Sequence, residues 1–594
     1  MRNPNQEQRA RNRSFRNGLP AAHQSVTLGA SPERWRQEPV TTANASDNAK
    51  THYAIAYESF DIQAAARSFV GDFKTGINVC AECCDRWAAD PDRIALHWED
   101  ASGSRLDMTF AQLRDASARF ANLLTAQGIV AGDCVSVMLP RVPELLIAAL
   151  GIWRAGAVYQ PMFTAFGSKA IEHRLAASRA KLVVTDSANR GKFDDIEDVP
   201  PIAVTNGRSR NEDIDLASDL SQYDTTYAPV ECNGDDSFLL MSTSGTTGLP
   251  KGLSVPIRAL ISFRAYMTFA IDLRPDDVYW NMADPGWAYG LYYAVVGPLL
   301  LGNATIFYDG AFAPDATYRV ILDRGVTNLA AAPTAYRLLI AAGEGMAARV
   351  KGKLRAASSA GEPLNPEVIR WFRQHLDVSV ADHYGQTEMG MCVNNHHGLD
   401  HEFRVGSTGF AMPGFRMVVL DEDDQELGPN APGMLAVDVA NSPTFWFTGY
   451  SREETPTIRG GYYRTGDTVE LEPSGHISFV GRGDDVITSS GYRIGPFDVE
   501  SALMEHPAVI EVAVIGKPDP ERTEIVKAFI VLASGCEQSK ALEEELRQHV
   551  RSRLSAHAYP REFAFVDNLP KTPSGKIQRF ILRNAEKARG GDPD

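Results

Sequence analysis

The sequence TSGTTGLPKG, which occupies residues 243–252, combines hydroxyls, glycines and one cation in a short stretch. Glycines allow backbone amides to approach phosphate oxygens, hydroxyls donate further hydrogen bonds, and a lysine adds positive charge. It is not a Walker sequence, because Pro250 replaces the second glycine and Gly252 replaces the Mg²⁺-binding Ser or Thr. Taken alone, the stretch is also compatible with a flexible turn. Its candidate phosphate ligands are Thr243, Ser244, Gly245, Thr246, Thr247, Gly248 and Lys251.

Five more motifs follow this loop in order: SAGEP at 359–363, HYGQTE at 383–388, YYRTGD at 462–467, GRGDDVITSSGYRIGP at 481–496 and PKTPSGKIQR at 570–579. Together with the loop, they resemble the adenylate-forming superfamily of acyl-CoA synthetases, adenylation domains and luciferases. The resemblance extends from about residue 80 to the C-terminus. Residues 489–520 and the KTPSGKIQR segment are most similar to the medium-chain acyl-CoA synthetases.

Composition excludes several other classes of protein. A chain of 594 residues should form two or more domains, and its formal charge of -16 argues against a nucleic-acid-binding surface. Seven cysteines without the spacing of a disulfide framework fit a reducing compartment. Cys80, Cys83 and Cys84 are expected on a packed helix, since no second pair of metal ligands lies near them in the sequence. The apolar stretch from Leu291 to Leu301 is too short to cross a bilayer, so no stable membrane insertion is expected.

The pattern along the chain predicts three parts. Residues 1–50 are poor in large apolar side chains and read as a disordered leader. Acidic residues among its arginines argue against a transit peptide, so the cytoplasm is preferred over the mitochondrial matrix. Residues 51–483 alternate helix and strand, which predicts a large α/β domain with parallel sheets covered by helices. Residues 484–594 change to shorter elements and predict a small, mobile α+β domain joined by a hinge at Asp484.

Several local patterns make this prediction specific. Thr109 and Gln112 form a capping box before a helix, and a second helix follows Pro143. Buried strands are expected at 134–139 and 182–185, with another helix from about Ser168. The acidic run 421–426 is expected to be a hairpin turn. In the small domain, helices are expected at 496–505 and 541–554 and strands at 509–515 and 526–532.

The resemblance implies an ATP site. Thr387 would bond the α-phosphate, Glu388 would bind Mg²⁺, and Asp467 would bind the ribose hydroxyls. The adenine platform would be formed by Gly361, Glu362, Pro363 and Tyr384, with Gly385 and Gln386 adjoining it. Arg482 and Arg493 resemble contacts of the hinge motif to phosphate or ribose.

The resemblance also implies two half-reactions. In the first, Lys576 would bridge the substrate carboxylate and the α-phosphate as an acyl-adenylate forms. The small domain would then rotate about Asp484, withdraw Lys576 and bring Gly491 and Tyr492 to the coenzyme A thiol. A glycine at 491 suits a narrow tunnel, although a simple turn would explain it too. The exposed Lys576 is also a candidate substrate of a lysine acetylase.

The acid is expected to lie behind Trp287, Ala288, Tyr289, Ala360 and Gly385. Acetate-specific relatives place a tryptophan at the position of Gly385, so the glycine is expected to leave volume for several more carbons. Trp287 and Tyr289 could equally flank an aromatic ring.

These residues predict an AMP-forming acid:CoA ligase that uses ATP, Mg²⁺ and coenzyme A on a medium-chain fatty or similar carboxylic acid. The alternatives are an aromatic, benzoate-like acid:CoA ligase, a stand-alone adenylation domain that loads a carrier protein, and a non-catalytic nucleotide-binding regulator. The presence of both Glu388 and Lys576 argues against the regulator.

Overall fold

The computed structural model describes residues 51–244, 250–451, 455–490, 492–554, 557–572 and 576–589. Residues 49–594 belong to one compact unit. The predicted leader at 1–50 lies outside the described residues. No helix in these described ranges is long and apolar enough to cross a membrane.

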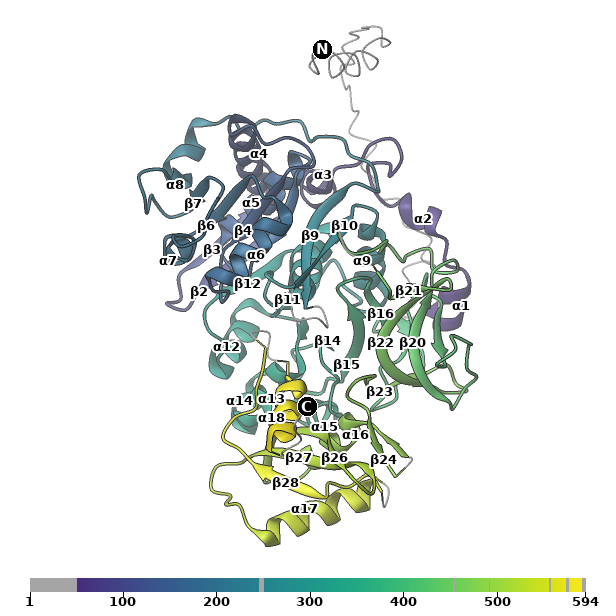
Figure 1. Cartoon of the computed structure of the whole chain (residues 1–594). Helices are drawn as coiled ribbons and strands as arrows, with labels where there is room; N and C mark the ends of the chain where they lie inside the picture. The colour runs from purple at the N-terminus through teal and green to yellow at the C-terminus, as the bar shows by residue number, and fades with distance from the viewer. Residues whose placement is uncertain are drawn as a thin grey trace, which may run out of the picture. The chain divides into compact units, whose positions relative to one another are not determined.

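A seven-stranded sheet forms the first half of the unit, in the order β10-β9-β5-β4-β6-β7-β8. Its pairs are parallel except β9 with β10, which form an antiparallel hairpin. The strands are β4 (Cys134–Met138), β5 (Val158–Pro161), β6 (Leu182–Thr185), β7 (Ile202–Val204), β8 (Ile214–Asp215), β9 (Ser237–Ser244) and β10 (Pro250–Pro256). Helices α4 (Phe110–Ala126), α5 (Pro143–Arg154) and α6 (Ser168–Ser178) lie beside it (Figure 1). The predicted parallel sheet is confirmed.

The beginnings of these elements follow the sequence closely. Thr109 Oγ1 accepts a hydrogen bond from the Gln112 amide at 3.2 Å, and the Gln112 side chain accepts one from the Thr109 amide at 2.8 Å. This confirms the capping box. Pro143 stands at the first turn of α5, where its missing N–H is no loss.

A second sheet follows the order β11-β13-β14-β15-β16-β18 and is parallel from β11 to β15. Its strands are β11 (Tyr279–Asn281), β13 (Asn328–Ala331), β14 (Ala356–Ala360), β15 (Val380–Gln386), β16 (Gly390–Asn394) and β18 (Phe410–Ala411). The associated helices are α9 (Ala259–Phe269), α12 (Pro314–Arg324), α13 (Pro333–Ala341) and α15 (Pro366–Leu376). The phosphate hairpin of the first sheet and the SAGEP and HYGQTE segments of the second therefore come from separate sheets.

Two further sheets of three and five strands belong to the large domain. One has the order β12-β2-β3, with β2 (Ile94–Asp100), β3 (Arg105–Thr109) and β12 (Thr305–Asp309). The other contains β19 (Met417–Leu420), β20 (Pro432–Asp438), β21 (Ile458–Arg459), β22 (Tyr462–Leu471) and β23 (Ile477–Arg482). Between β19 and β20, the Asp421 amide donates to the Gln425 carbonyl at 3.0 Å, which confirms the acidic hairpin turn.

The remaining α-helices and β-strands before the small domain are short, and β1 and β17 among them form a two-stranded parallel sheet. They are β1 (Thr51–His52), α1 (Tyr53–Glu58), α2 (Ile62–Ala66), α3 (Val79–Cys83), α7 (Ser187–Arg190), α8 (Leu216–Asp219), α10 (Ala288–Gly290), a π-helix (Leu291–Val296), α11 (Gly297–Leu301), α14 (Glu344–Ala347) and β17 (Leu399–Asp400). Cys80, Cys83 and Cys84 are buried at α3, and all seven cysteines of the chain are free thiols. The expectation of a packed helix is confirmed.

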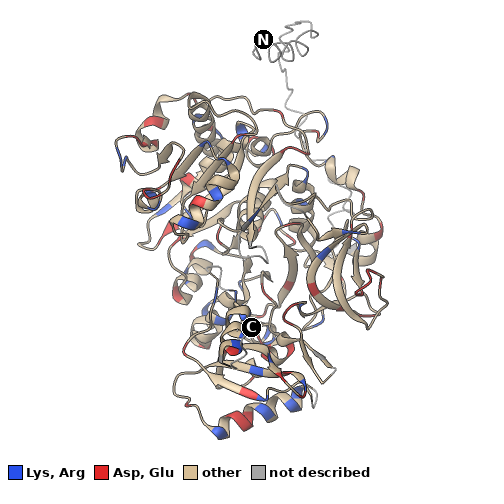
Figure 2. Ribbon diagram, viewed as in Figure 1, with Lys and Arg blue, Asp and Glu red and all other residues tan. Residues whose placement is uncertain are grey.

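The C-terminal elements form their own sheet and core. They are β24 (Ile487–Ser489), β25 (Tyr492–Ile494), α16 (Pro496–Met504), β26 (Val509–Asp519), β27 (Thr523–Leu532), α17 (Lys540–Arg553), β28 (Glu562–Phe565) and α18 (Arg579–Arg589). Leu546 and Val550 are the buried face of α17, while the other face carries charges of both signs (Figure 2). The small α+β architecture is confirmed, and the exact boundary at 483/484 stays a prediction.

Candidate active site

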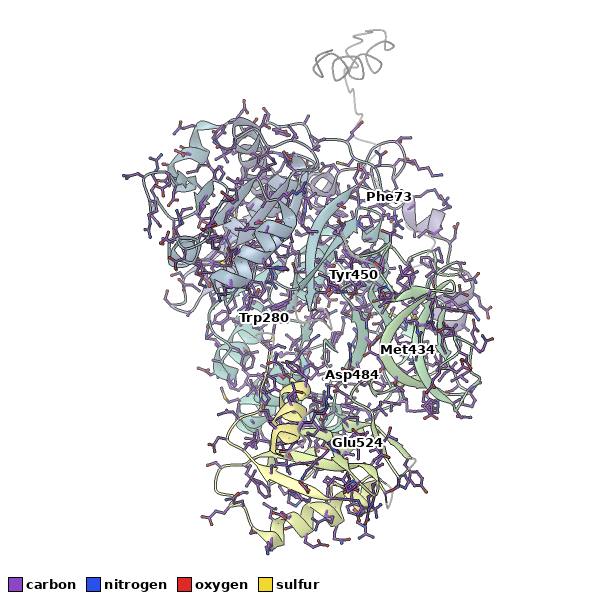
Figure 3. The ribbon with its side chains drawn as sticks, viewed as in Figure 1. Phe73, Trp280, Met434, Tyr450, Asp484 and Glu524 are labelled. Carbon is purple, nitrogen blue, oxygen red and sulfur yellow. The ribbon has the colours of Figure 1, made fainter. Side chains whose placement is uncertain are left out.

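The two ends of the phosphate-loop sequence lie on the paired strands β9 and β10. Thr243 pairs with Lys251 across the two strands, so a residue with a hydroxyl stands opposite a residue with a cation. The Lys251 Nζ lies 5.2 Å from the centroid of the Tyr450 ring, which Figure 3 labels. Gly245, Thr246, Thr247 and Gly248 lie outside the described residues, as does the side chain of Ser244. Their phosphate contacts stay predictions.

Gly361 follows β14 directly in a backbone conformation that favours glycine. Its φ is +98°, and a Cβ built there would meet nothing within 4 Å. The space above the backbone is therefore open, as a flat adenine ring would require. The Glu362 carboxylate is held beside it by Thr334 Oγ1 at 3.2 Å and Arg337 Nη2 at 3.3 Å. Pro363 follows in the same segment.

The predicted ribose carboxylate, Asp467, is fixed by the HYGQTE segment. Its Oδ2 accepts hydrogen bonds from Tyr384 Oη at 2.6 Å and Gln386 Nε2 at 2.9 Å. Its Oδ1 lies 3.6 Å from Arg482 Nε. Burial raises the pKa of Asp467, and the nearby Arg482 opposes that rise. One carboxylate oxygen of Asp467 is held by two hydrogen bonds and the other lies beside an arginine, an arrangement that is suited to bind the hydroxyls of a sugar.

Glu388 is buried at the end of the same segment, with 8% of its surface exposed. Its Oε1 accepts a hydrogen bond from Tyr450 Oη at 2.8 Å. Burial raises the pKa of Glu388, and the hydrogen bond from Tyr450 opposes the rise. Thr387 precedes it, with its carbonyl held by Tyr292 Oη at 3.1 Å.

The donor set at Glu388 fits Mg²⁺. In the described part of the chain there is no group of three or more His, Cys, Asp and Glu side chains that could hold a metal. Mg²⁺ is usually bound by one or two carboxylates together with substrate phosphates and water, so a single carboxylate beside a phosphate loop suits it.

Lys576 interacts electrostatically with site residues of the large domain. Its amide donates to Thr572 Oγ1 at 3.1 Å, and its carbonyl accepts from the Thr572 amide at 2.8 Å, so two hydrogen bonds join residues 572 and 576. The residue as a whole is exposed, yet desolvation of the amine lowers the pKa of Lys576. The carboxylates of Glu362, Asp467 and Glu388 act in the opposite direction, and Arg482 adds to the lowering. The ammonium therefore lies within electrostatic range of these four groups.

Three of the predicted acyl-pocket residues contribute to one apolar cluster, and a fourth, Trp287, packs against other aromatic rings. Ala288, Tyr289 and Ala360 belong to a single hydrophobic cluster, and Ala360 is fully buried. The Trp287 ring packs against Phe163 and Phe166, with centroids 5.5 and 5.6 Å away. Phe163 and Phe166, which the sequence did not single out, therefore extend the aromatic wall.

The structure contradicts the prediction that Gly385 leaves open volume for the acyl chain. A Cβ built on Gly385 would lie 2.1 Å from the Gly390 carbonyl oxygen and 2.7 Å from Met391 Cα. The β15–β16 pair has a register shift between Tyr384 and Gly385, and this brings the backbone of β16 directly over the glycine. The expected open volume at Gly385 is therefore wrong, because backbone occupies it. The glycine is required for close approach of two strands.

The residues assigned to coenzyme A are described only in part. Gly491 and the Arg493 side chain lie outside the described residues. Tyr492 is 51% exposed as a residue, and its ring stacks on His557 with centroids 3.9 Å apart. Asp484 lies in the turn between β23 and β24, and its side chain is 65% exposed. An exposed turn is a suitable place for a hinge, and the hinge role stays a prediction.

Sequence reasoning missed several residues that shape this site. Tyr450 contacts both Lys251 and Glu388, Tyr463 Oη donates to Gln386 Oε1 at 2.7 Å, and Arg337 anchors Glu362. Tyr463 belongs to the YYRTGD motif, but Tyr450 and Arg337 lie outside all six motifs. Only their position in the fold reveals their contacts.

Comparison with known proteins identifies the family. Residues 84–449 match the AMP-binding enzyme family, and residues 498–576 match the AMP-binding enzyme C-terminal domain. The chain therefore belongs to the AMP-binding enzyme family, and it is an AMP-forming acyl-CoA synthetase, as the motifs predict.

Curated relatives and solved structures agree with this assignment. Acetyl-coenzyme A synthetase of Bacillus subtilis (strain 168) is 38% identical, over 90% of this chain and 95% of its own length. Acyl-coenzyme A synthetase ACSM3, mitochondrial, of Mus musculus is 35% identical over 83% of this chain and 86% of its own. The crystal structure of Brucella canis acyl-CoA synthetase is 59% identical, with a TM-score of 0.75, covering 91% of this chain and 100% of that one. A benzoate CoA ligase from Burkholderia xenovorans LB400 is 26% identical, with a TM-score of 0.76 and coverage of 85% and 100%.

Proposed function

We propose that this synthetase activates a medium-chain fatty acid or a similar carboxylic acid, with Lys576 as the cation of the first half-reaction. One observation carries the role of Lys576: its amine comes from the C-terminal part of the chain and lies in electrostatic range of Glu362, Asp467, Glu388 and Arg482. In that half-reaction a carboxylate oxygen attacks the α-phosphorus of ATP, and the bond to the leaving pyrophosphate breaks. A cation between the two approaching anions lowers the barrier.

The large domain supplies the other contacts to ATP. Thr243, Lys251 and the loop between them bind phosphates, Thr387 bonds the α-phosphate, and Asp467 binds the ribose with Arg482 nearby. Gly361 and Tyr384 form the adenine platform. Glu388 is the residue that would hold Mg²⁺, which neutralises charge on the phosphates when it is bound.

The second half-reaction transfers the acyl group to coenzyme A. The thiol sulfur forms a bond to the acyl carbon, the bond between that carbon and the adenylate oxygen breaks, and AMP leaves. The small domain rotates about Asp484, so that Lys576 withdraws and Gly491 and Tyr492 face the thiol. The solvent-exposed turn at Asp484 supports this role.

The apolar region at Trp287 is the proposed acid site. Each buried CH₂ contributes about 0.8 kcal/mol, so an apolar wall favours longer acids until it is filled. Because the backbone of β16 occupies the space beside Gly385, the volume for the acyl chain must lie next to Trp287, Tyr289 and Ala360. The aromatic wall of Phe163, Phe166 and Trp287 favours a benzoate-like acid as the second candidate, since aromatic rings pack well edge to face.

A substrate profile tests this proposal. Pyrophosphate release should be measured with straight-chain acids from acetate to dodecanoate and with benzoate, in the presence and absence of coenzyme A. We expect kcat/KM to rise several-fold per carbon up to a medium chain length, as buried CH₂ groups accumulate. A maximum at acetate would contradict a medium-chain substrate, and a maximum at benzoate would favour the aromatic alternative.

Replacing Tyr450 with phenylalanine tests the role of Glu388. The pKa of Glu388 is already raised by burial, and losing the hydrogen bond from Tyr450 should raise it further. Because Mg²⁺ binds the ionised carboxylate, activity is lost as pH falls through this pKa. We expect the acid limb of ATP–pyrophosphate exchange to move up by about one pH unit, since such a bond is worth roughly 1.5 kcal/mol.

Tyr462→Phe is the matched control, because its exposed hydroxyl donates to Glu426 at 2.9 Å, at the surface of another sheet. Its acid limb should match that of the wild type. An unshifted limb in a folded Tyr450→Phe protein would show that Glu388 does not set the acid limb.

Two further assignments accompany this function. Lys576 is exposed as a residue, and we propose it as a substrate of a lysine acetylase, since acetylation would remove the charge that the first half-reaction needs. The free thiols at all seven cysteines fit a reducing compartment, and we assign the protein to the cytoplasm.

A further inference from the structure

An alternating series of charged side chains connects the ribose carboxylate to the helix that follows Lys576. Arg482 lies 3.6 Å from Asp467 and 3.7 Å from Asp484, measured from its Nε. Asp484 also lies 3.8 Å from Arg583 Nη2, and Arg583 donates to the neighbouring Asp485. We call Arg482, Asp484, Arg583 and Asp485 the hinge charges; Figure 3 labels Asp484 near α18.

The series continues into the buried part of the small domain. Arg579, the first residue of α18, donates to both carboxylate oxygens of Glu500 at 2.8 Å and lies 3.6 Å from Asp485. Arg579 follows Lys576 by three residues, and Arg583 lies one helical turn further on. The two arginines therefore hold the helix to which the Lys576 loop is attached.

The two halves of the series differ in strength. The side chains of Glu500 and Asp485 are only 7% and 11% exposed, and their arginines make short or bidentate contacts. Charge-assisted pairs of this kind are stronger than exposed ones. At Asp484 the side chain is 65% exposed and both contacts exceed 3.6 Å, and such pairs are worth little in water. The contacts inside the small domain should therefore persist when those at Asp484 break.

We propose that Arg583 is a positioning residue for the first half-reaction: it ties α18, and with it the Lys576 loop, to the hinge turn. This rests on the proposed function of Lys576 in adenylate formation. Arg583 contacts Asp485 firmly and Asp484 weakly, so it orients Lys576 toward the ATP site and releases the turn when the domain moves. The side-chain contacts of Arg583 among the described residues are with Asp484 and Asp485, neither of which is assigned to ATP binding.

The test compares Arg583→Gln with Arg583→Lys in the full-length protein. Acid-dependent ATP–pyrophosphate exchange reports the first half-reaction, and thioester formation from a supplied acyl-adenylate reports the second. We expect Arg583→Gln to lower the kcat of exchange about tenfold, with the KM for ATP within about twofold and the second half-reaction unchanged. Arg583→Lys keeps the charge and should recover most of the exchange rate.

Two of these readouts distinguish a positioning role from a purely structural one: the loss confined to the kcat of exchange, and its recovery by lysine. Arg551→Gln is the control, because Arg551 lies on the exposed side of α17 and packs on Tyr559, away from the hinge charges. It should behave as the wild type in all assays.

Equal loss of both half-reactions in Arg583→Gln, or no loss of exchange, would overturn the positioning role. Lys576→Ala, measured in parallel, separates this outcome from failure of the proposed function. If Lys576→Ala loses exchange and Arg583→Gln keeps it, only the positioning role is wrong. If Lys576→Ala keeps exchange, the assigned function of Lys576 fails and the positioning role fails with it.

Discussion

Replacing Lys576 with alanine is expected to lower acid-dependent ATP–pyrophosphate exchange by roughly 10²- to 10³-fold, the usual cost of removing one transition-state donor. The reason is the position of its amine, which lies in range of Glu362, Asp467 and Glu388 in the large domain. The same variant should still convert a supplied acyl-adenylate to thioester, because that step does not need the cation. Lys576→Gln, which resembles the acetylated side chain, should behave as the alanine variant does.

Lys571→Ala is the matched control for this prediction. Lys571 stands in the same segment, but its Nζ pairs with Glu511 within the small domain at 2.5 Å. A pair of this kind contributes about 0 to 1 kcal/mol, so exchange should change little. Equal loss of both half-reactions in Lys576→Ala would show that the lysine holds the fold of its loop.

Gly385→Ala should be the most disruptive single-methyl substitution in the site. The added Cβ would meet the Gly390 carbonyl oxygen at 2.1 Å, and that atom belongs to the backbone of the paired strand. Forcing atoms into such a contact typically costs about 1 to 3 kcal/mol, and more where backbone must move. Because β15 carries Tyr384 and Gln386, which hold Asp467, we expect lower thermal stability and weaker ATP binding together.

Gly345→Ala is the control, because Gly345 lies in α14 with nothing within 4 Å of its added Cβ. Alanine is the better helix former there by roughly 1 kcal/mol, so stability should hold or increase. The chain-length profile for acids shows whether Gly385 is needed for the close approach of two strands or borders the acyl pocket. If Gly385→Ala keeps its stability and only discriminates against longer acids, the glycine borders the acyl pocket after all.

Much of the fold could be predicted because local signals and global arrangement agree. The Thr109–Gln112 capping box, Pro143 at the start of α5 and the run Leu182–Thr185 each place an element correctly. The six ordered motifs also identify the family, since such a series of glycines, acids and one lysine rarely occurs by chance. These signals are short and lie within single stretches of chain.

The sequence by itself determined the family, the α/β and α+β architecture and the residue types available to bind ATP. The tertiary structure alone decided which side chains are in contact: Tyr450 with Glu388, Tyr384 with Asp467, and Arg583 with the hinge turn. It also closed the space at Gly385 with the backbone of β16. The sequence of one strand predicts which of its residues are buried, but it does not predict the register of the neighbouring strand or the position of a distant helix. Contacts across the fold therefore depend on packing that no single segment encodes.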